Sequence, residues 1–277
     1  MQFTMRRPQP GRWTALLRLA NGVDGAHLHE PFSGRISFAP AQVNALGVPD
    51  SAGTVLKAGQ PVTAVVVVTN TGVATKDFFV DPRLDRTALL PLLGIGATNV
   101  PLPIPGNVRP PRFIVPTGTD RIVAAAQGNV PILMSIQAGF GAPRREGIAL
   151  SGNLSVASDS ARQVAPGVWS AIPVELGPFP PGGERGTASV TALAETRVFD
   201  GAVTSTTGDV WQQTVNAAAP YTPLTLAPGA TGLITVTFTP TASPGTVVRG
   251  SLEVSTFSFA TFSGDQVISV PYAYRVG

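Results

Sequence analysis

The chain has 277 residues, of which 13% are charged, 30 are glycine and 27 are proline. Glycine and proline interrupt short runs of Val, Thr, Ile and Phe, a composition that is typical of turn-rich all-β proteins and excludes a helix bundle. The net charge of +3 is spread thinly, so no nucleic-acid partner is expected, and the absence of cysteine excludes disulfides and thiolate metal sites.

An internal repeat marks the start of the chain. A Pro-Gly-x-Trp turn precedes an apolar strand at residues 10–13 and again at residues 166–169, and each copy is followed by a Gly-rich loop and a second strand. We therefore interpret residues 1–40 as the C-terminal strands of a truncated β-sandwich, which makes the chain the tail of something longer. The basic start is not followed by an apolar signal segment, and the longest apolar run, residues 64–68, is too short to span a membrane.

The next strands predict an immunoglobulin-like sandwich in two parts. Residues 54–70 read as two strands around a turn at 57–61, and residues 77–84 as a third, all within a first part at 41–100. A second part at 200–277 has about four strands, expected at residues 224–226, 233–239, 247–256 and 267–276. Neither set is enough for a stable sandwich, but together they make seven strands.

A different strand pattern occupies residues 101–199. Strands are expected near residues 113–115, 121–126, 130–136, 148–156, 169–176 and 187–198. We interpret this segment as a jelly-roll-like sandwich inserted into the immunoglobulin-like one, because sandwich loops accept insertions at small free-energy cost. The predicted fold class is therefore all-β, with tandem antiparallel β-sandwiches; the alternative is three sequential, half-formed modules.

Several motifs resemble one region of a known enzyme family. They lie at residues 10–14, 31–38, 58–62, 68–72, 79–81, 164–169, 204–211 and 271–277. Together they resemble the C-terminal accessory region of secreted bacterial subtilisin-like serine peptidases, which contains immunoglobulin-like, fibronectin type III-like and pre-peptidase C-terminal-like sandwiches. The Asp-x-Gly, His-Gly-x and Gly-Thr-Ser contexts of the catalytic triad are absent from the sequence, so the resemblance carries over no catalytic residue.

The resemblance implies a non-catalytic, extracellular accessory region. Such a region would stabilise, position or tether a protease domain, and its partners would be its own parent protease domain, the cell surface or a substrate polymer. One alternative is an independent adhesion module that binds carbohydrate or a surface protein through loops at one sandwich end. Another, an unrecognised hydrolase, requires a polar cluster that the sequence does not display.

The only two histidines, His27 and His29, are the candidate metal ligands of the sequence. On a strand, this spacing places both imidazoles on one face, where Glu30 or Asp24 could complete a divalent metal site. A short His-x-His in a polar loop is more often solvated, and spacing fixes no third ligand. We predict no catalytic, cofactor or metal site.

Acidic residues recur at Asp77, Asp81 and Asp85, with Arg83 and Arg86 interleaved. Calcium binding is one interpretation, but no Asp-rich loop with a glycine at its bend accompanies them. Ion pairing along an edge strand, which discourages aggregation, is the expected role. Asp209 and Asp265 each follow a glycine and are interpreted as turn residues.

The large aromatic residues fall into three groups. Trp13 and Trp169 follow Pro-Gly at a strand start and are expected to be buried. Trp211 lies in a polar segment and is the candidate for an exposed contact with a ligand. Tyr272 and Tyr274 share one face of the last strand and are expected in a core or an interface.

Overall fold

The computed structural model describes residues 41–104, 106, 108–138, 145–149, 153–157, 164–176, 186–214 and 220–277. This part of the chain consists of β-strands and one short 3-10 helix, η1 (Val210–Thr214). The strands are β1 (Ala41–Leu46), β2 (Asp50–Leu56), β3 (Val62–Asn70), β4 (Lys76–Pro91), β5 (Gly94–Ile95), β6 (Asn99–Leu102), β7 (Arg112–Val115), β8 (Arg121–Gly128), β9 (Ile132–Ala138), β10 (Arg145–Ala149), β11 (Asn153–Ala157), β12 (Gly167–Glu175), β13 (Gly186–Phe199), β14 (Val203–Ser205), β15 (Leu224–Leu226), β16 (Thr231–Phe238), β17 (Val247–Ser258) and β18 (Ser263–Val276).

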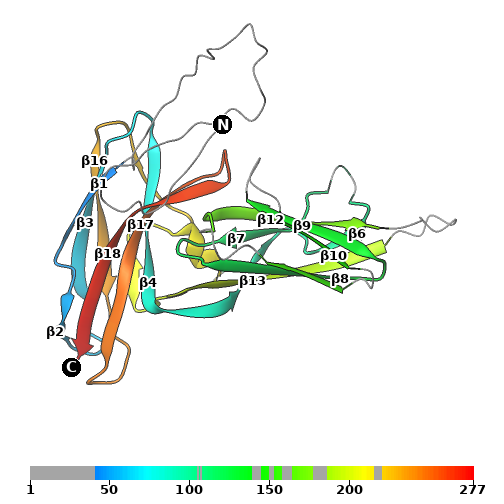
Figure 1. Cartoon of the computed structure of the whole chain (residues 1–277). Coiled ribbons are helices and arrows are strands. Elements are labelled where there is room, and N and C mark those ends of the chain that lie inside the picture. Colours follow the sequence, from blue (N-terminus) through cyan, green and yellow to red (C-terminus); the bar gives the residue numbers. More distant parts are fainter. Residues whose placement is uncertain are drawn as a thin grey trace, which may run out of the picture. The chain divides into compact units, whose positions relative to one another are not determined.

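The smaller sheet has four antiparallel strands in the order β1-β3-β16-β14. Its strands alternate between buried and outward-facing side chains, as β3 shows: Ala64, Val66 and Val68 are buried, while Val65 and Val67 between them are half-buried. This period of two is what a strand with one covered face requires. Figure 1 shows β1, β3 and β16 beside β17 and β18, which belong to the larger sheet.

The larger sheet runs in the order β10-β9-β12-β18-β17-β4-β13-β8-β11, with short strands added at its sides. Strand β4, 16 residues long, changes partners along its length. Residues 78–84 pair with β17, whereas residues 87–91 pair with β13. Strand β4 therefore links the strands around β17 to the strands around β13 through backbone hydrogen bonds (Figure 1).

Two hydrophobic cores are formed by different parts of the sequence. The first contains buried residues from 56–80 together with residues from 203–276, including Phe78, Phe238 and Tyr274. The second contains only residues from 92–194, including Met134 and Leu102. A strand-rich segment within the chain therefore has its own core, between segments that build the other core jointly.

The expected all-β class with antiparallel sandwiches is confirmed. The single strand expected at residues 148–156 is wrong: β10 and β11 are separate strands, and they pair with β9 and β8 respectively. Strands β1, β5, β6 and β14 were not predicted. The residue boundaries of the four proposed segments stay predictions, and those at residues 1–40, with Trp13, His27 and His29, lie outside the described residues.

Among the described residues, no helix is both long and apolar enough to cross a membrane.

Substitution of Trp169, on β12, tests the packing of the second core. Its ring packs partly buried against that core, and its Nε1 donates a hydrogen bond to the carbonyl oxygen of Ala165 at 2.8 Å. We expect Trp169→Ala to lower the free energy of unfolding by about 3 kcal/mol, because it removes both packing and this bond. Trp169→Phe, which keeps most of the ring volume, should lower it by about 1 kcal/mol. Urea denaturation measures both; a loss below about 1 kcal/mol for the alanine variant would contradict the packing.

Candidate functional site

A cluster of charged side chains is buried where β4 lies against β17. In β4, Asp81 and Arg83 point away from the first core, to which the alternate residues Phe78 and Val80 belong. The register places Glu253 of β17 directly opposite Asp81. Together with Arg197 of β13 and Asp209 before η1, these residues form what we call the buried charged cluster: Asp81, Arg83, Arg197, Asp209 and Glu253.

The Asp81–Arg83 ion pair is enclosed by protein. Nε of Arg83 lies 2.7 and 2.8 Å from the two carboxylate oxygens of Asp81, and neither side chain is exposed to solvent. Nη1 of Arg83 donates to the carbonyl oxygen of Arg197 at 3.1 Å, and the guanidinium lies 5.7 Å from the ring centre of Phe199. A charge buried this deeply is tolerated only with a partner, so Asp81 and Arg83 must fold together.

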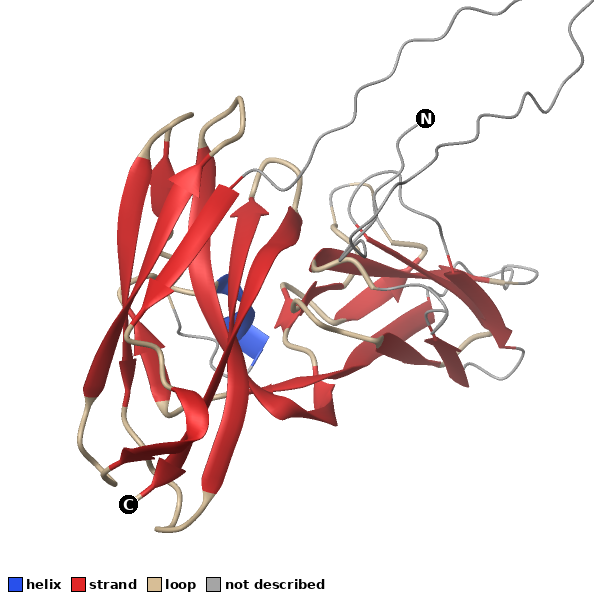
Figure 2. Cartoon of the chain, turned by 60° about the vertical axis from the view of Figure 1, so that its left-hand side comes forward, coloured by secondary structure: helices blue, strands red, loops and turns tan. Residues whose placement is uncertain are grey.

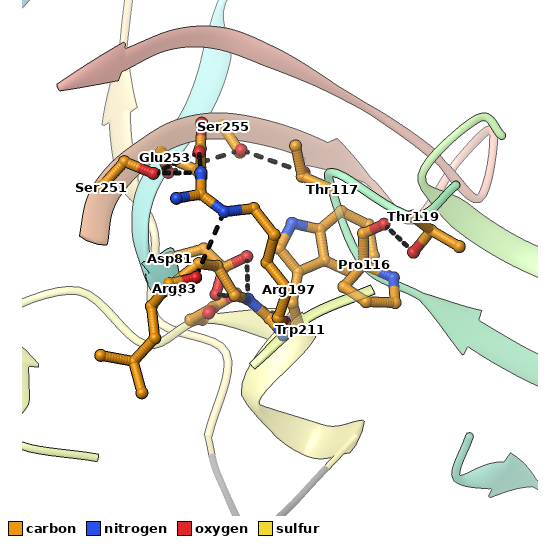
Figure 3. A network of polar contacts seen from close by, with 12 residues as sticks. Asp81, Arg83, Pro116, Thr117, Thr119, Arg197, Trp211, Ser251, Glu253 and Ser255 are labelled. Atoms are coloured by element: carbon orange, nitrogen blue, oxygen red, sulfur yellow. Dashed lines mark hydrogen bonds and ion pairs between the residues drawn. The ribbon is translucent and has the colours of Figure 1, made fainter. Parts of the chain in front are cut away.

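Glu253 receives hydrogen bonds from several strands (Figure 3). Its Oε1 accepts from Nη1 of Arg197 at 2.9 Å, from Oγ of Ser251 at 2.6 Å and from Oγ of Ser269 at 3.1 Å. Its Oε2 accepts from Nε2 of Gln266. The carboxylate is almost fully buried, and its lone pairs are engaged by the protein itself.

Asp209 joins η1 to the same cluster. Its Oδ1 accepts a hydrogen bond from the backbone N–H of Trp211 at 2.7 Å, while its Oδ2 has no hydrogen-bond donor among the described residues. Burial raises the pKa of Asp209 well above its usual range, and the neighbouring negative charge of Asp81 raises it further. Both effects favour the neutral form of the Asp209 carboxyl group.

Counting charges supports this assignment. The cluster has three carboxyl groups, on Asp81, Asp209 and Glu253, and two guanidinium groups, on Arg83 and Arg197. With Asp209 neutral the net charge is zero, which a site of low dielectric constant favours. The chemical role of the cluster is therefore electrostatic cohesion between β4, β13, β17 and η1.

Trp211 is fully buried, so the expectation of an exposed contact is wrong. It lies in an aromatic layer with Phe79 and Phe257, whose ring centres are 5.9 and 5.5 Å from its own in edge-to-face geometry. Ile114 of β7 and Val168 of β12 also pack into this layer. The polar flanks suggested a solvated loop, but Val210 and Trp211 lie in the short helix η1, drawn in blue in Figure 2, and both are buried.

A close backbone approach makes room for the indole. A Cβ at Gly264 would lie 2.5 Å from the carbonyl oxygen of Thr256 and 3.0 Å from Cζ2 of Trp211. Only glycine fits between the β17 backbone and this ring.

Tyr272 and Tyr274 lie in the first core, which confirms their predicted burial. The hydroxyl of Tyr272 donates a hydrogen bond to Oδ2 of Asp200, and burial together with that carboxylate raises the pKa of Tyr272. Burial, with a smaller effect of Asp200, raises the pKa of Tyr274 to about 12. Both hydroxyls thus stay neutral at ordinary pH and serve packing.

The acidic residues of β4 do not act as an edge-strand charge row, and this expectation is corrected. Strand β4 is central, between β17 and β13, so Asp81 is enclosed. Asp77 accepts from Oγ1 of Thr225 at 2.6 Å, and Asp85 pairs with Arg197 at 3.2 Å, so the three carboxylates have separate partners. Asp265 lies within β18 rather than in a turn.

Sequence reasoning missed Arg197, Glu253 and Asp200, and it assigned Arg83 to ion pairs along an edge strand. One signal was present: residues 78–84 carry an Asp and an Arg two positions apart within an otherwise apolar run, which indicates a same-face ion pair in a buried strand. Among the described residues, no group of three or more His, Cys, Asp or Glu is arranged to hold a metal ion.

Comparisons with known proteins yield no family. No protein-family model and no curated protein matches the chain. Among solved structures, the chain is similar to a PapD-like domain of human CEP192, with 6% identity over 93% of this chain and 98% of that one and a TM-score of 0.27. AvmM, described as catalysing macrocyclization in alchivemycin A biosynthesis, has 10% identity over 86% and 89% of the two chains, with a TM-score of 0.25.

A family 123 glycoside hydrolase from Clostridium perfringens has 9% identity over 86% of this chain and 27% of that one, with a TM-score of 0.24. TM-scores this low carry no argument about function.

Glu253 provides the test of cohesion. Glu253→Gln removes the charge that compensates Arg197, and we expect it to lower the free energy of unfolding by about 3 kcal/mol. The matched control is Glu195→Gln, since Glu195 pairs with Arg121 at 3.8 Å with both side chains nearly half exposed; a change within about 0.5 kcal/mol is expected there. Chemical denaturation at pH 7 compares the two, and equal effects would refute a cohesive role for the cluster.

Proposed function

We propose that the chain is a non-catalytic, extracellular β-sandwich region that stabilises, positions or tethers a subtilisin-like protease domain. The proposal rests on the structural roles of the motifs that resemble the subtilisin-like accessory region and that lie within the described residues. They supply turns, core residues and buried polar contacts, as expected of a scaffold that carries another domain.

The motif at residues 68–72 forms a turn with a buried side chain. Nδ2 of Asn70 donates to the carbonyl oxygens of Ala74 and Leu226, and its Oδ1 accepts from the N–H of Gly72. These bonds hold the end of β3 against β15. The motif thus fixes the frame of the first sandwich.

The motif at residues 204–211 also contributes buried side chains. Oγ1 of Thr207 accepts from the N–H of Val80 at 3.3 Å, Asp209 binds the N–H of Trp211, and Trp211 fills the aromatic layer. The motif at residues 79–81 meets it there through the ring of Phe79, which packs on Trp211, and through the N–H of Val80. The motifs at residues 79–81 and 204–211, which are far apart in the sequence, therefore pack against each other. This contact favours a structural role for both.

The reading frame upstream and an activity assay test this function together. We expect the DNA before the Met1 codon to encode, in frame, the Asp-x-Gly, His-Gly-x and Gly-Thr-Ser contexts of a subtilisin-like domain. Deleting residues 41–277 from that longer protein should shorten the half-life of its peptidase activity on heating, because the domain loses its support. The purified 277-residue chain should neither hydrolyse casein nor react with a fluorophosphonate; serine labelling with turnover would refute the proposal.

A second candidate, an adhesion module, is favoured by one face of the smaller sheet. This face has an apolar centre in which Leu233, 62% exposed, lies opposite Val67, and it contains no ionisable side chain. Its residues are Gln42, Asn44, Leu46, Thr63, Val65, Val67, Thr69, Thr204, Thr231, Leu233, Thr235 and Thr237. An uncharged, hydroxyl-bearing surface suits a neutral cell-surface polysaccharide.

Co-sedimentation with insoluble cellulose, chitin and peptidoglycan tests this second candidate. Binding that falls at least about tenfold in Leu233→Lys, where a desolvated charge opposes contact, would support it. Val73→Lys is the matched control, because Val73 is 76% exposed but lies in the turn after β3. Absence of sedimentation with all three polymers, or equal loss in both variants, would count against adhesion through this face.

A further inference from the structure

We propose that the turn between β17 and β18, together with strand β7, forms a docking site for a protein segment that carries an acidic side chain beside an apolar one. In this site, Arg112 of β7 binds the carboxylate and Phe259 of the turn contacts the apolar side chain. The inference goes beyond the proposed function, because it names a binding surface and does not depend on support of a protease domain. It rests on an exposed aromatic ring that is held in place and on a guanidinium group that has no partner among the described residues.

Phe259 is an exposed ring on a fixed base. It lies in the turn at residues 259–262, and it is 59% exposed. Its ring centre lies 5.0 Å from that of Phe257 and 5.4 Å from that of Tyr221, both in edge-to-face geometry. The hydroxyl of Tyr221 donates to the carbonyl oxygen of Phe257 at 3.2 Å, so the two supporting rings are themselves held together. A ring held in this way loses little conformational freedom on binding, as an interface anchor requires.

The other end of the turn is fixed by Phe262. This residue has a φ of +51°, a left-handed conformation that bulky residues rarely adopt. Its carbonyl oxygen accepts from the N–H of Val168 on β12 at 2.8 Å, and its ring packs against the aromatic layer around Trp211. Backbone strain of this kind persists only where the surroundings hold it, and it clusters at binding sites. The turn is therefore preorganised at both ends.

Arg112 provides a cation without a counterion in the part of the chain that the structure describes. Its guanidinium lies 5.4 Å from the ring centre of Phe262, and its Nε is buried without a hydrogen-bond partner. No described carboxylate forms an ion pair with it. Burial, with a further effect of the charge of Arg109, lowers the pKa of Arg112, and a bound anion would offset both effects. Because a buried donor without an acceptor is unfavourable, a ligand that accepts from this group is favoured.

The chemistry of the partner follows from these two groups. A guanidinium binds a carboxylate through two parallel N–H···O bonds. Phe259 and Phe262 are three residues apart, so their Cα atoms lie within about 11 Å of each other. Since Arg112 lies beside the ring of Phe262, a segment of a few residues can reach both ends of the site. The turn itself contains no basic residue and so does not extend Arg109 and Arg112 into the basic stripe that a nucleic acid requires.

NMR titration of the full chain with two matched peptides tests the site. Acetyl-Leu-Glu-Leu-amide carries a carboxylate between apolar side chains, and acetyl-Leu-Gln-Leu-amide lacks only the charge. The Nε–H signal of Arg112, identified by its loss in Arg112→Gln, and the ring signals of Phe259 report on the two ends of the site. The matched controls are Arg249→Gln, because Arg249 is exposed on β17, and Leu233→Ala, because Leu233 is exposed on the smaller sheet.

We expect the Glu peptide to shift both sets of signals and to bind at least about fivefold more tightly than the Gln peptide, because it adds a charge-assisted hydrogen bond. Arg112→Gln should remove this preference, and Phe259→Ala should weaken binding of both peptides about threefold through lost apolar contact. Both control variants should behave as the wild type. If Arg112→Gln does not fold, the two peptides compared on the wild type and on Phe259→Ala still decide.

Three results would overturn the proposal. The first is the absence of any shift with either peptide, and the second is equal affinity for the two. The third is binding of inorganic phosphate at Arg112 as tightly as the Glu peptide, with no response of the Phe259 ring, which would indicate a simple anion site.

Discussion

The pairing of charges buried in β4 is the interaction on which the rest of the structure depends. Asp81 and Arg83 have no access to water, so each requires the other, and the second contact of Arg83 requires the carbonyl oxygen of Arg197 on β13. Removing one such partner leaves an uncompensated charge in a medium of low dielectric constant, whereas an apolar pair could slip or separate with less penalty. The charges therefore specify one arrangement of the surrounding strands.

This constraint is reinforced by the course of β4 itself. The same strand supplies Phe78 to the first core, Phe79 to the aromatic layer and, in its second half, a ladder to β13. Backbone hydrogen bonds, apolar packing and charge pairing thus meet in a few residues. Three kinds of contact in one strand make this a firm joint between the two sandwiches, which the supporting role proposed above would require.

Several features were accessible from the sequence because they depend on local rules. Alternating residues in 62–70 and 231–238 gave strands with one buried face, Pro-Gly pairs gave turns, and the shared parity of Tyr272 and Tyr274 gave a common buried face. The all-β class follows from these patterns together. The short strands β5, β6 and β14 were missed, since two to four residues carry too little periodicity to be recognised.

The sequence by itself thus determined the fold class, most strand positions and the inward face of the last strand, because side-chain alternation and turn chemistry act over neighbouring residues. Only the tertiary structure decided the fates of Trp211 and Asp209, whose polar neighbours indicate a solvated loop. Likewise, Glu253 meets Asp81 and Arg197 across strands that are distant in sequence. Burial and charge pairing are set by which strands become neighbours, and local pattern does not encode that choice.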